Sequence, residues 1–251
     1  MEDHIGPANP LYNNFSPSVD PTPVVKVLDK GYVRLIDSMG TDLNVVNAAR
    51  ASYDKESKEF DGKDARLLQF LVREKHTAPF RHGILSLEIY APLLVARQWW
   101  KHVVGSETEG MGDPYLAWNE SSRRYITENE EFYIPNGDQW RTKPANSKQG
   151  SGENLAGSAG DRWSVSLENT IIDGAIKYQD AMTAGIAPEQ ARLFLSAYAM
   201  YVRWRWTSSL QGIMHFIELR DESHAQLEIQ EYARAVRTLA ATKFPVSIGA
   251  V

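Results

Sequence analysis

Two short segments of the chain carry the polar groups that a bound nucleotide requires. The first, Arg97–His102, supplies cations and a glutamine amide, and the second, Asn119–Tyr125, supplies a glutamate, two serines and two arginines. Guanidinium, ammonium and hydroxyl groups bind phosphate, while amide and carboxylate groups bind the polar edges of a base or sugar. The two segments together predict a site for a phosphorylated pyrimidine and a second anionic group.

The order of residues in these segments resembles the signature of the flavin-dependent thymidylate synthases. That signature runs Arg-His-Arg, a few residues, Ser, one residue, Asn-Glu, one residue, Ser, one residue, Arg-Tyr. Segments 190–192 and 219–230 also resemble family motifs, so the resemblance extends over about residues 24–240. The residues at the signature positions are Lys101, His102, Val103, Ser106, Asn119, Glu120, Ser122, Arg124 and Tyr125.

The resemblance implies reductive methylation of dUMP to dTMP and gives the central catalytic role to Arg220. In the family the matching arginine faces the carbonyl and N3 side of the uracil, where a fixed cation stabilises the negative charge that develops as C5 becomes nucleophilic. The competing interpretation is a surface arginine paired with Asp221 or Glu222. Ser122 is expected to bind substrate, because the sequence places no histidine or aspartate to activate it as a nucleophile. The expected nucleotide-binding residues are Gln98, Lys101, Glu120, Ser121, Ser122, Arg124 and Arg192.

The resemblance also implies tightly bound FAD as hydride carrier, NADPH as reductant, methylenetetrahydrofolate as one-carbon donor, and a homotetramer with sites at its subunit interfaces. His76 matches a histidine that the family places over the flavin, although Ala78 lacks the usual hydroxyl there and Arg81 reverses a charge. Simpler interpretations remain open, since Ser52 can cap a helix and a lone histidine is more often a packed side chain than a ligand. The expected cofactor-binding residues are Ser52, His76, Lys101, His102, Glu120, Ser209 and His215.

The signature departs from the family pattern in two places. Lys101 replaces a planar, forked guanidinium by a point charge, and Val103 puts an apolar side chain where the family has a cation. Residues 107–117 form an insertion whose glycines and Asp-Pro pair predict a loop beside the site. Two alternatives therefore stay open: flavin-dependent methylation or hydroxymethylation of another pyrimidine nucleotide such as dCMP, and a homologue that holds flavin or nucleotide without turnover.

The composition is that of an ordinary soluble globular protein, with 251 residues, 43% hydrophobic and 24% charged. A net charge of -5 argues against a protein that coats nucleic acid, so a phosphate must be met by a local group of cations. No apolar run reaches the roughly 18 residues of a membrane span, and the N-terminus has no signal-peptide pattern. The expected compartment is the cytoplasm, or a host's cytoplasm if the protein is phage-encoded.

Cysteine is absent from the sequence. The familiar route to methylation at C5 of a pyrimidine begins with addition of a cysteine thiolate to C6, and this chain has no such nucleophile. His224 and Glu228 lie about one helical turn apart, but without a third ligand they do not predict a metal site. Any chemistry at C5 must therefore activate the ring electrostatically.

Periodicity and turn residues predict one α+β domain over residues 24–251, with a small, mainly antiparallel or mixed sheet packed against long helices. The proline-rich residues 1–23 are expected to form an extended or disordered leader, and 136–160 a surface loop. No Gly-x-Gly-x-x-Gly or Walker motif is present, so a flavin would not use a Rossmann crossover. The expected strands lie at 24–28, 32–37 and 85–89, with a short strand or turn at 132–135. The expected helices lie at 42–52, 64–74, 92–102, 161–184, from 188 toward 206, and 209–239.

The last predicted helix suggests how a site is shared between subunits. Eleven residues make almost three helical turns, so Ser209 lies with Arg220, and His215 lies with Gln226, on two separate faces. The signature's first half is expected on a helix and its second half, with Asn119 and Glu120, on a loop. Two faces on one helix are expected if each subunit contributes to two active sites.

Overall fold

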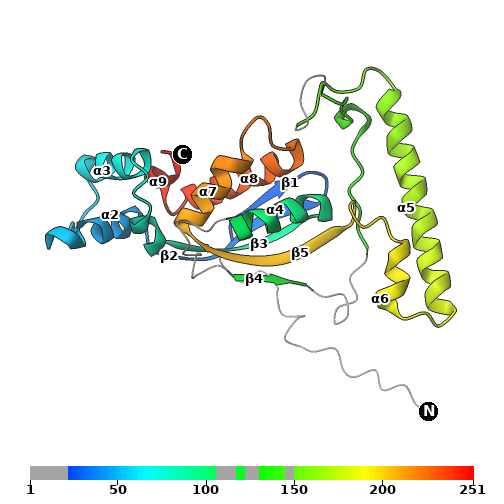
Figure 1. Ribbon diagram of the computed structural model, residues 1–251, viewed down its shortest axis with the longest axis horizontal. Coiled ribbons are helices and arrows are strands. Elements are labelled where there is room, and N and C mark those ends of the chain that lie inside the picture. The colour runs from blue at the N-terminus through cyan, green and yellow to red at the C-terminus, as the bar shows by residue number, and fades with distance from the viewer. Residues whose placement is uncertain (1–21, 106–116, 122–129, 145–149) are drawn as a thin grey trace, which may run out of the picture.

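The centre of the protein is an antiparallel sheet of five strands in the order β1-β2-β3-β5-β4 (Figure 1). The computed structural model describes residues 22–105, 117–121, 130–144 and 150–251, and only the backbone within 102–105. Alternation of apolar and polar residues explains β3, in which Leu85, Leu87 and Ile89 are fully buried. The strands are β1 (Val24–Val27), β2 (Gly31–Met39), β3 (Ile84–Pro92), β4 (Ala117–Glu120) and β5 (Tyr201–Ser209).

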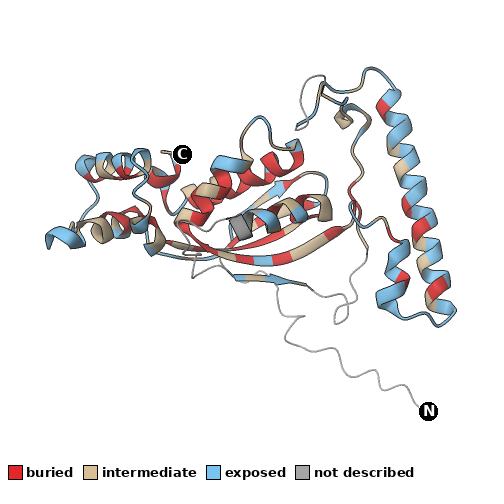
Figure 2. Cartoon of the chain, viewed as in Figure 1, coloured by how far each residue is buried: buried red, intermediate tan, exposed pale blue. Residues whose placement is uncertain are grey.

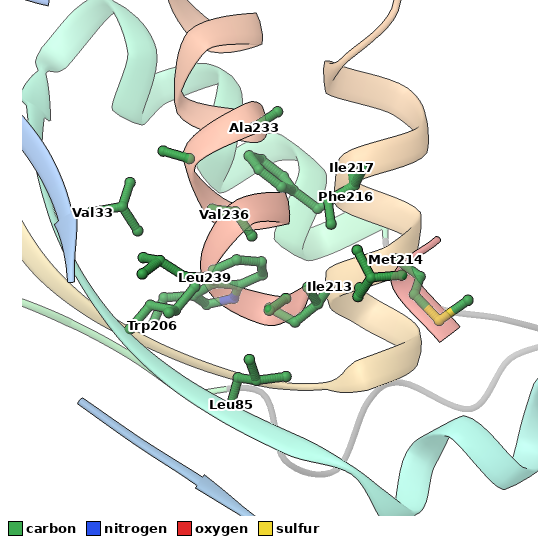
Figure 3. Close-up of a cluster of buried hydrophobic side chains, with 14 of the residues drawn as sticks. Val33, Leu85, Trp206, Ile213, Met214, Phe216, Ile217, Ala233, Val236 and Leu239 are labelled. Carbon is green, nitrogen blue, oxygen red and sulfur yellow. The ribbon is translucent and has the colours of Figure 1, made fainter. Parts of the chain in front are cut away.

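Three helices cover one face of this sheet: α4 (Leu93–Gly105), α7 (Leu210–Arg220) and α8 (Leu227–Ala241) (Figure 1). Their buried residues face the strands (Figure 2), and Figure 3 shows Phe216, Val236 and Leu239 meeting Trp206 of β5. Trp99 of α4 stacks on Phe216 with ring centroids 4.2 Å apart. This aromatic core fixes α4, which carries Gln98, Lys101 and His102, and α7, which carries His215 and Arg220, relative to the sheet.

A cluster of short helices closes one end of the sheet (Figure 1). The buried carboxylate of Asp42 accepts hydrogen bonds from the amides of Val246 and Ser247, at 2.7 and 3.1 Å, and so joins the start of α2 to α9. Asp61 caps α3 by accepting from the amides of Lys63 and Asp64. The elements here are α2 (Asp42–Arg50), η1 (Ala51–Tyr53), α3 (Gly62–Arg73), η2 (Ala78–His82) and α9 (Pro245–Ile248).

At the opposite end a long helix, α5 (Ala159–Thr183), stands apart from the sheet (Figure 1). It ends before Gly185, whose φ of 82° is open to glycine without strain. A small second core of Phe132, Ile171, Leu195 and Ala199 attaches it to the body. The neighbouring elements are η3 (Gly137–Gln139), α6 (Pro188–Ala191) and η4 (Arg192–Phe194). Among the described residues, no helix is both long and apolar enough to cross a membrane.

The predicted α+β class, the hairpin at 24–37 and the helices at 42–52, 64–74 and 161–184 are confirmed. The helix expected from 188 toward 206 is wrong, because only 188–191 are α-helical and 201–209 form β5. In that segment Trp204 and Trp206 are buried while Arg205 is exposed. Alternation of buried and exposed side chains favours a strand, and aromatic residues fit a pleated sheet.

The single helix expected over 209–239 is also wrong, because residues 221–226 separate α7 from α8. Asp221 ends α7, and its carboxylate accepts from Arg234 Nε at 2.9 Å and from Arg237 Nε at 3.2 Å, which folds α8 back on α7. His215 and Gln226 therefore share no helix, and Ser209 and Arg220 lie at the two ends of α7. The expected pair of functional faces on one helix does not exist.

The loop expected for Asn119 and Glu120 is wrong, because both residues lie on the edge strand β4, where Trp118 stacks on Trp204 at 4.8 Å. Residues 107–116, which are most of the predicted insertion, lie outside the described residues, as does the leader up to residue 21. The predicted loop at 136–160 contains η3 and an isolated bridge between Arg141 and Asn154.

Candidate active site

Gln98 and Lys101 lie on the face of α4 that turns away from the core. Val95, Ala96 and Trp99 are fully buried on the other side of this helix, whereas Gln98 is half-buried and Lys101 is exposed. The Nε2 group of Gln98 donates to Oε1 of Gln226 at 2.5 Å, which joins α4 to the start of α8. Because Gln98 and Lys101 are three residues apart on a helix, α4 presents two of the predicted nucleotide ligands side by side.

Arg220 is the last residue of α7, and its guanidinium is half-buried. Its Nη1 donates to the carbonyl oxygen of Leu219 at 3.3 Å, while its buried Nε has no hydrogen-bond partner among the described residues. Burial lowers the pKa of Arg220 from its ordinary value, and Glu222 opposes this shift, but a guanidinium stays charged in proteins. Arg220 is therefore a cation at the end of a helix, and its guanidinium has N–H donors that no described residue uses.

The alternative interpretation of Arg220, as half of a surface ion pair, does not fit the geometry. Asp221 pairs with Arg234 and Arg237, and no described carboxylate lies within ion-pair distance of Arg220. Because no carboxylate of the described residues neutralises it, its positive charge can act on a ligand.

His215 lies on the same helix as Arg220 and is half-buried. Burial lowers the pKa of His215 below its ordinary value of 6.5, Glu218 opposes the shift and Arg220 adds to it. The imidazole is therefore mainly neutral near pH 7 and can both donate and accept. Ser209, by contrast, is buried, and its hydroxyl accepts from the amide of Gly212 at 3.2 Å as the N-cap of α7. Ser209 remains a predicted cofactor contact, and it also has a structural role as the cap of α7.

A cavity of about 510 Å³ opens next to Gln98, between the start of α8, the start of α4 and the segment 133–141. Gln226 and Glu228 line it, and Glu228 receives two hydrogen bonds from Arg141 Nη2, at 2.6 and 2.8 Å. The remaining lining residues are mostly apolar or aromatic: Leu94, Tyr133, Pro135, Trp140, Leu167, Ala197, Tyr198 and Ala199. An apolar cavity with a few converging polar groups is typical of small-molecule sites.

The sequence predicts no role for Arg141, places Gln226 only with His215 on one face of the expected last helix, and suggests Glu228 only as a weak metal ligand. Gln226 and Glu228 lie inside the family-like segment 219–230, so a signal for them was present. For Arg141 there was none, because it falls in a stretch whose glycines, serines and asparagines predict only a surface loop.

Glu120 and Ser121 lie at the sheet edge, at the end of β4. The amide of Ser121 donates to the carbonyl oxygen of Arg203 at 2.8 Å, which extends the pairing with β5 by one residue. Glu120 is exposed, yet partial burial of its carboxyl raises the pKa. Ser122 and Arg124 lie outside the described residues, as do the side chains of His102 and Val103.

Three of the predicted ligands do not come close to Arg220 within one chain. Arg192 is exposed in η4 at the α5 end of the molecule, where its Nε donates to the carbonyl oxygen of Pro188 at 3.4 Å (Figure 1). Ser52 and His76 are exposed at the other end, beside α2 and α3. His76 lies edge-on to Phe70, with ring centroids 5.8 Å apart. The chain thus joins Gln98 to Gln226, and it leaves Arg192, Ser52 and His76 on separate surfaces.

Comparison with known proteins identifies the kind of enzyme that this fold and these residues form. Two solved structures of a UMP/dUMP methylase, PolB from Streptomyces cacaoi, bound with 5-Br dUMP and 5-Br UMP, share the fold. Their TM-scores are 0.74 and 0.73 at 28% and 26% identity, with 90% of this chain covered and 96% and 95% of theirs.

A family described as thymidylate synthase complementing protein matches residues 34–246. Flavin-dependent thymidylate synthases from Thermosipho africanus and Thermus thermophilus are 37% and 35% identical over 224 residues. These matches cover 88% and 89% of this chain and 90% and 76% of the relatives. The chain belongs to the flavin-dependent thymidylate synthase family and is an enzyme of that family.

Proposed function

We propose that the protein catalyses the reductive methylation of dUMP to dTMP, with methylenetetrahydrofolate as one-carbon donor, NADPH as reductant and FAD as cofactor. The observation that carries this proposal is Arg220, a half-buried cation without a described carboxylate partner at the end of α7. Relatives named flavin-dependent thymidylate synthase, at 34–37% identity, support it.

Arg220 acts by making C5 of the pyrimidine nucleophilic. C5 is nucleophilic when the ring takes on enolate character, with negative charge on the ring carbonyl and N3, and a fixed guanidinium nearby lowers the energy of that charge distribution. The chain contains no cysteine, so a thiolate cannot activate the ring by adding to C6. Electrostatic polarisation by Arg220 is the activation that this chain can supply.

Binding of the nucleotide rests on residues from several elements. Gln98 and Lys101 present an amide and an ammonium from α4, and Glu120 and Ser121 stand at the edge of the sheet. Ser122, Arg124 and Arg192 complete the proposed set for ribose and phosphate, with the guanidinium groups as bidentate donors. Lysine at 101 gives a single point contact in place of a fork.

The residues proposed for FAD have the donor chemistry that such a group needs. Exposed Ser52 and His76 offer hydrogen-bond donors, exposed Lys101 offers a cation for a pyrophosphate, and burial lowers the pKa of half-buried His215, which favours its neutral form. His102, Glu120 and Ser209 are the further proposed contacts. When bound, FAD supplies reversible hydride transfer. A methylene carbon requires one hydride to become a methyl group, and NADPH is the proposed source of that hydride.

We also propose a homotetramer whose sites are shared between subunits. Arg192 follows α6 and Arg220 ends α7, and these two helices lie well apart (Figure 1), so we expect the two arginines to meet at one nucleotide from different subunits. The long helix α5 exposes an apolar set that a second copy can cover (Figure 2): Trp163, Val165, Ile172 and Ile176, which are 51–56% exposed. We expect the enzyme to act in the cytoplasm.

The test is to incubate purified protein with dUMP, methylenetetrahydrofolate and NADPH, and to weigh the nucleotide product by mass spectrometry. We expect dTMP to form and the protein as isolated to show flavin absorption. A protein that forms no dTMP under these conditions, or that forms it without flavin, contradicts the proposal. A yellow protein whose flavin is reduced by NADPH without any nucleotide turnover indicates a binding homologue.

A second candidate is flavin-dependent methylation or hydroxymethylation of another pyrimidine nucleotide, such as dCMP. Its support is the departure of the signature at Lys101 and Val103, together with a fold shared with a methylase whose structures hold both 5-Br UMP and 5-Br dUMP. The same incubation with dCMP or UMP in place of dUMP separates the candidates, because a mass gain on only one of these nucleotides identifies the substrate.

A further inference from the structure

A chain of hydrogen bonds runs from a buried ion pair to the side chain of Gln98. Arg141 Nη2 donates to both carboxylate oxygens of Glu228, and Gln226 Nε2 donates to Glu228 Oε2 at 2.7 Å. Gln226 Oε1 then accepts from Gln98 Nε2 at 2.5 Å. Glu228 is 5% exposed, so this chain starts from a carboxylate that the fold holds in place.

The direction of every bond in this chain follows from Glu228. An ionised carboxylate only accepts, so Gln226 must turn its NH₂ group toward Glu228 and its carbonyl oxygen toward Gln98. Gln98 must then turn its own NH₂ group toward Gln226. The carbonyl oxygen of Gln98 is left pointing away from the chain, and no described donor reaches it. Because each amide has one donor end and one acceptor end, the orientation is fixed by chemistry, although nitrogen and oxygen have nearly the same shape.

We propose that Glu228, held by Arg141 and acting through Gln226, is a positioning residue that makes Gln98 present a hydrogen-bond acceptor to the base, and that this selects uracil over cytosine. The proposal rests on the proposed function, in which Gln98 contacts the nucleotide. Uracil carries a hydrogen on N3 and can donate to an acceptor there, whereas N3 of neutral cytosine is itself an acceptor. Two acceptors that face each other in a partly dry site leave both unpaired, which is costly.

The orientation of the Gln98 amide can discriminate between ligands at the base but not at the sugar. A sugar hydroxyl can rotate to donate or to accept, so the orientation of an amide does not discriminate at a hydroxyl. N3 of a pyrimidine cannot adapt in this way. A contact between Gln98 and N3 therefore depends on the orientation of the amide, and a contact with the sugar does not.

Replacing Glu228 by glutamine should reverse the orientation of the whole chain. Arg141 only donates, so the new amide must turn its oxygen to Arg141 and its NH₂ group to Gln226. Gln226 and Gln98 then flip in turn, and Gln98 presents its NH₂ group to the base. In Glu228→Gln we expect the preference for dUMP over dCMP to fall by about tenfold or more, because one hydrogen bond is lost with dUMP and one is gained with dCMP.

The measurement is equilibrium binding of dUMP and of dCMP to the flavin-loaded protein by titration calorimetry, with thermal unfolding of each variant. A second variant, Gln226→Leu, leaves the Arg141–Glu228 pair intact and cuts the chain of bonds. Gln226→Leu should bring the ratio of the affinity for dUMP to the affinity for dCMP toward one, even if Glu228→Gln folds poorly. The matched control is Glu88→Gln, which removes a similarly buried carboxylate, paired with Arg34 and Arg205 on the sheet. It should leave the ratio unchanged.

The outcomes separate this inference from the proposed function. A wild type that prefers dUMP, with a ratio that moves in Glu228→Gln and Gln226→Leu but not in Glu88→Gln, supports the inference. If the wild type prefers dUMP and neither variant moves the ratio, the inference fails and the proposed function stands. If the variants lose affinity equally for dUMP and dCMP, Glu228 has a purely structural role, and this result also overturns the inference. A wild type that binds no dUMP, or that prefers dCMP, contradicts both.

Discussion

Replacement of Arg220 by alanine tests the central catalytic assignment. The guanidinium is half-buried and has no described carboxylate within ion-pair distance, so its charge is available to the transition state. Two unit charges about 4 Å apart at an effective dielectric constant of about 20 interact by roughly 4 kcal/mol. Loss of a single oxyanion-stabilising donor elsewhere costs about 10²–10³ in kcat. We therefore expect Arg220→Ala to lower kcat by about 10²–10³.

The fold should survive this substitution. Among the described residues, the Arg220 side chain donates only the weak 3.3 Å hydrogen bond to Leu219, so its loss should change the free energy of unfolding by less than about 1 kcal/mol. Arg220→Lys keeps the charge but loses the planar fork, and should fall between wild type and alanine. The matched control is Arg66→Ala, at an exposed arginine of α3, which should keep wild-type kcat.

The assay follows product formation from dUMP by mass spectrometry under saturating substrate, with bound flavin measured by absorption and folding by thermal unfolding. Variants must carry as much flavin as wild type for the comparison of kcat to be valid. If Arg220→Ala forms dTMP at the wild-type rate, polarisation of the base by this arginine is refuted, and the activation of C5 has to be assigned to another group.

Three further predictions address assembly and pH. A mixture of Arg192→Ala and Arg220→Ala subunits, refolded together, should recover about a quarter of wild-type activity if each site takes these residues from two subunits; no recovery would mean that one subunit supplies both. Ile172→Glu with Ile176→Glu on α5 should lower the oligomeric state in sedimentation without unfolding the subunit, whereas Lys177→Ala on the same helix should not; a tetramer that persists would show that this face of α5 is not an interface. Because burial lowers the pKa of His215, the unfolded chain binds more protons below pH 6.5, so stability is fully present above that pH and declines as pH falls through the folded pKa. His215→Asn should flatten this decline in thermal unfolding measured from pH 8 to pH 5, and an unchanged profile would contradict the linkage.

Two things follow directly from the amino-acid sequence: which reactive side chains the protein has, and those helices, strands and turns whose formation depends only on residues close together in the chain. The absence of cysteine excludes a thiolate route on composition alone. The β1–β2 hairpin and the end of α5 at Gly185 follow from local turn and capping preferences, and both predictions are confirmed. Gln98, Lys101 and Arg220 are identified from motifs, and the structure joins Gln98 to Gln226, which lines a cavity.

The meeting of distant segments depends on the folded core and has no local signal. Arg141 and Glu228 are 87 residues apart, and nothing in the residues around Arg141 indicates that the fold carries it to the start of α8. Asp221 stabilises the break between α7 and α8 by accepting hydrogen bonds from Arg234 and Arg237. The position of Arg192 depends on how α5 and α6 are placed beside the sheet. Helix and turn preferences act over a few residues, whereas these contacts form only when the whole core packs, because burial is a property of the assembled chain.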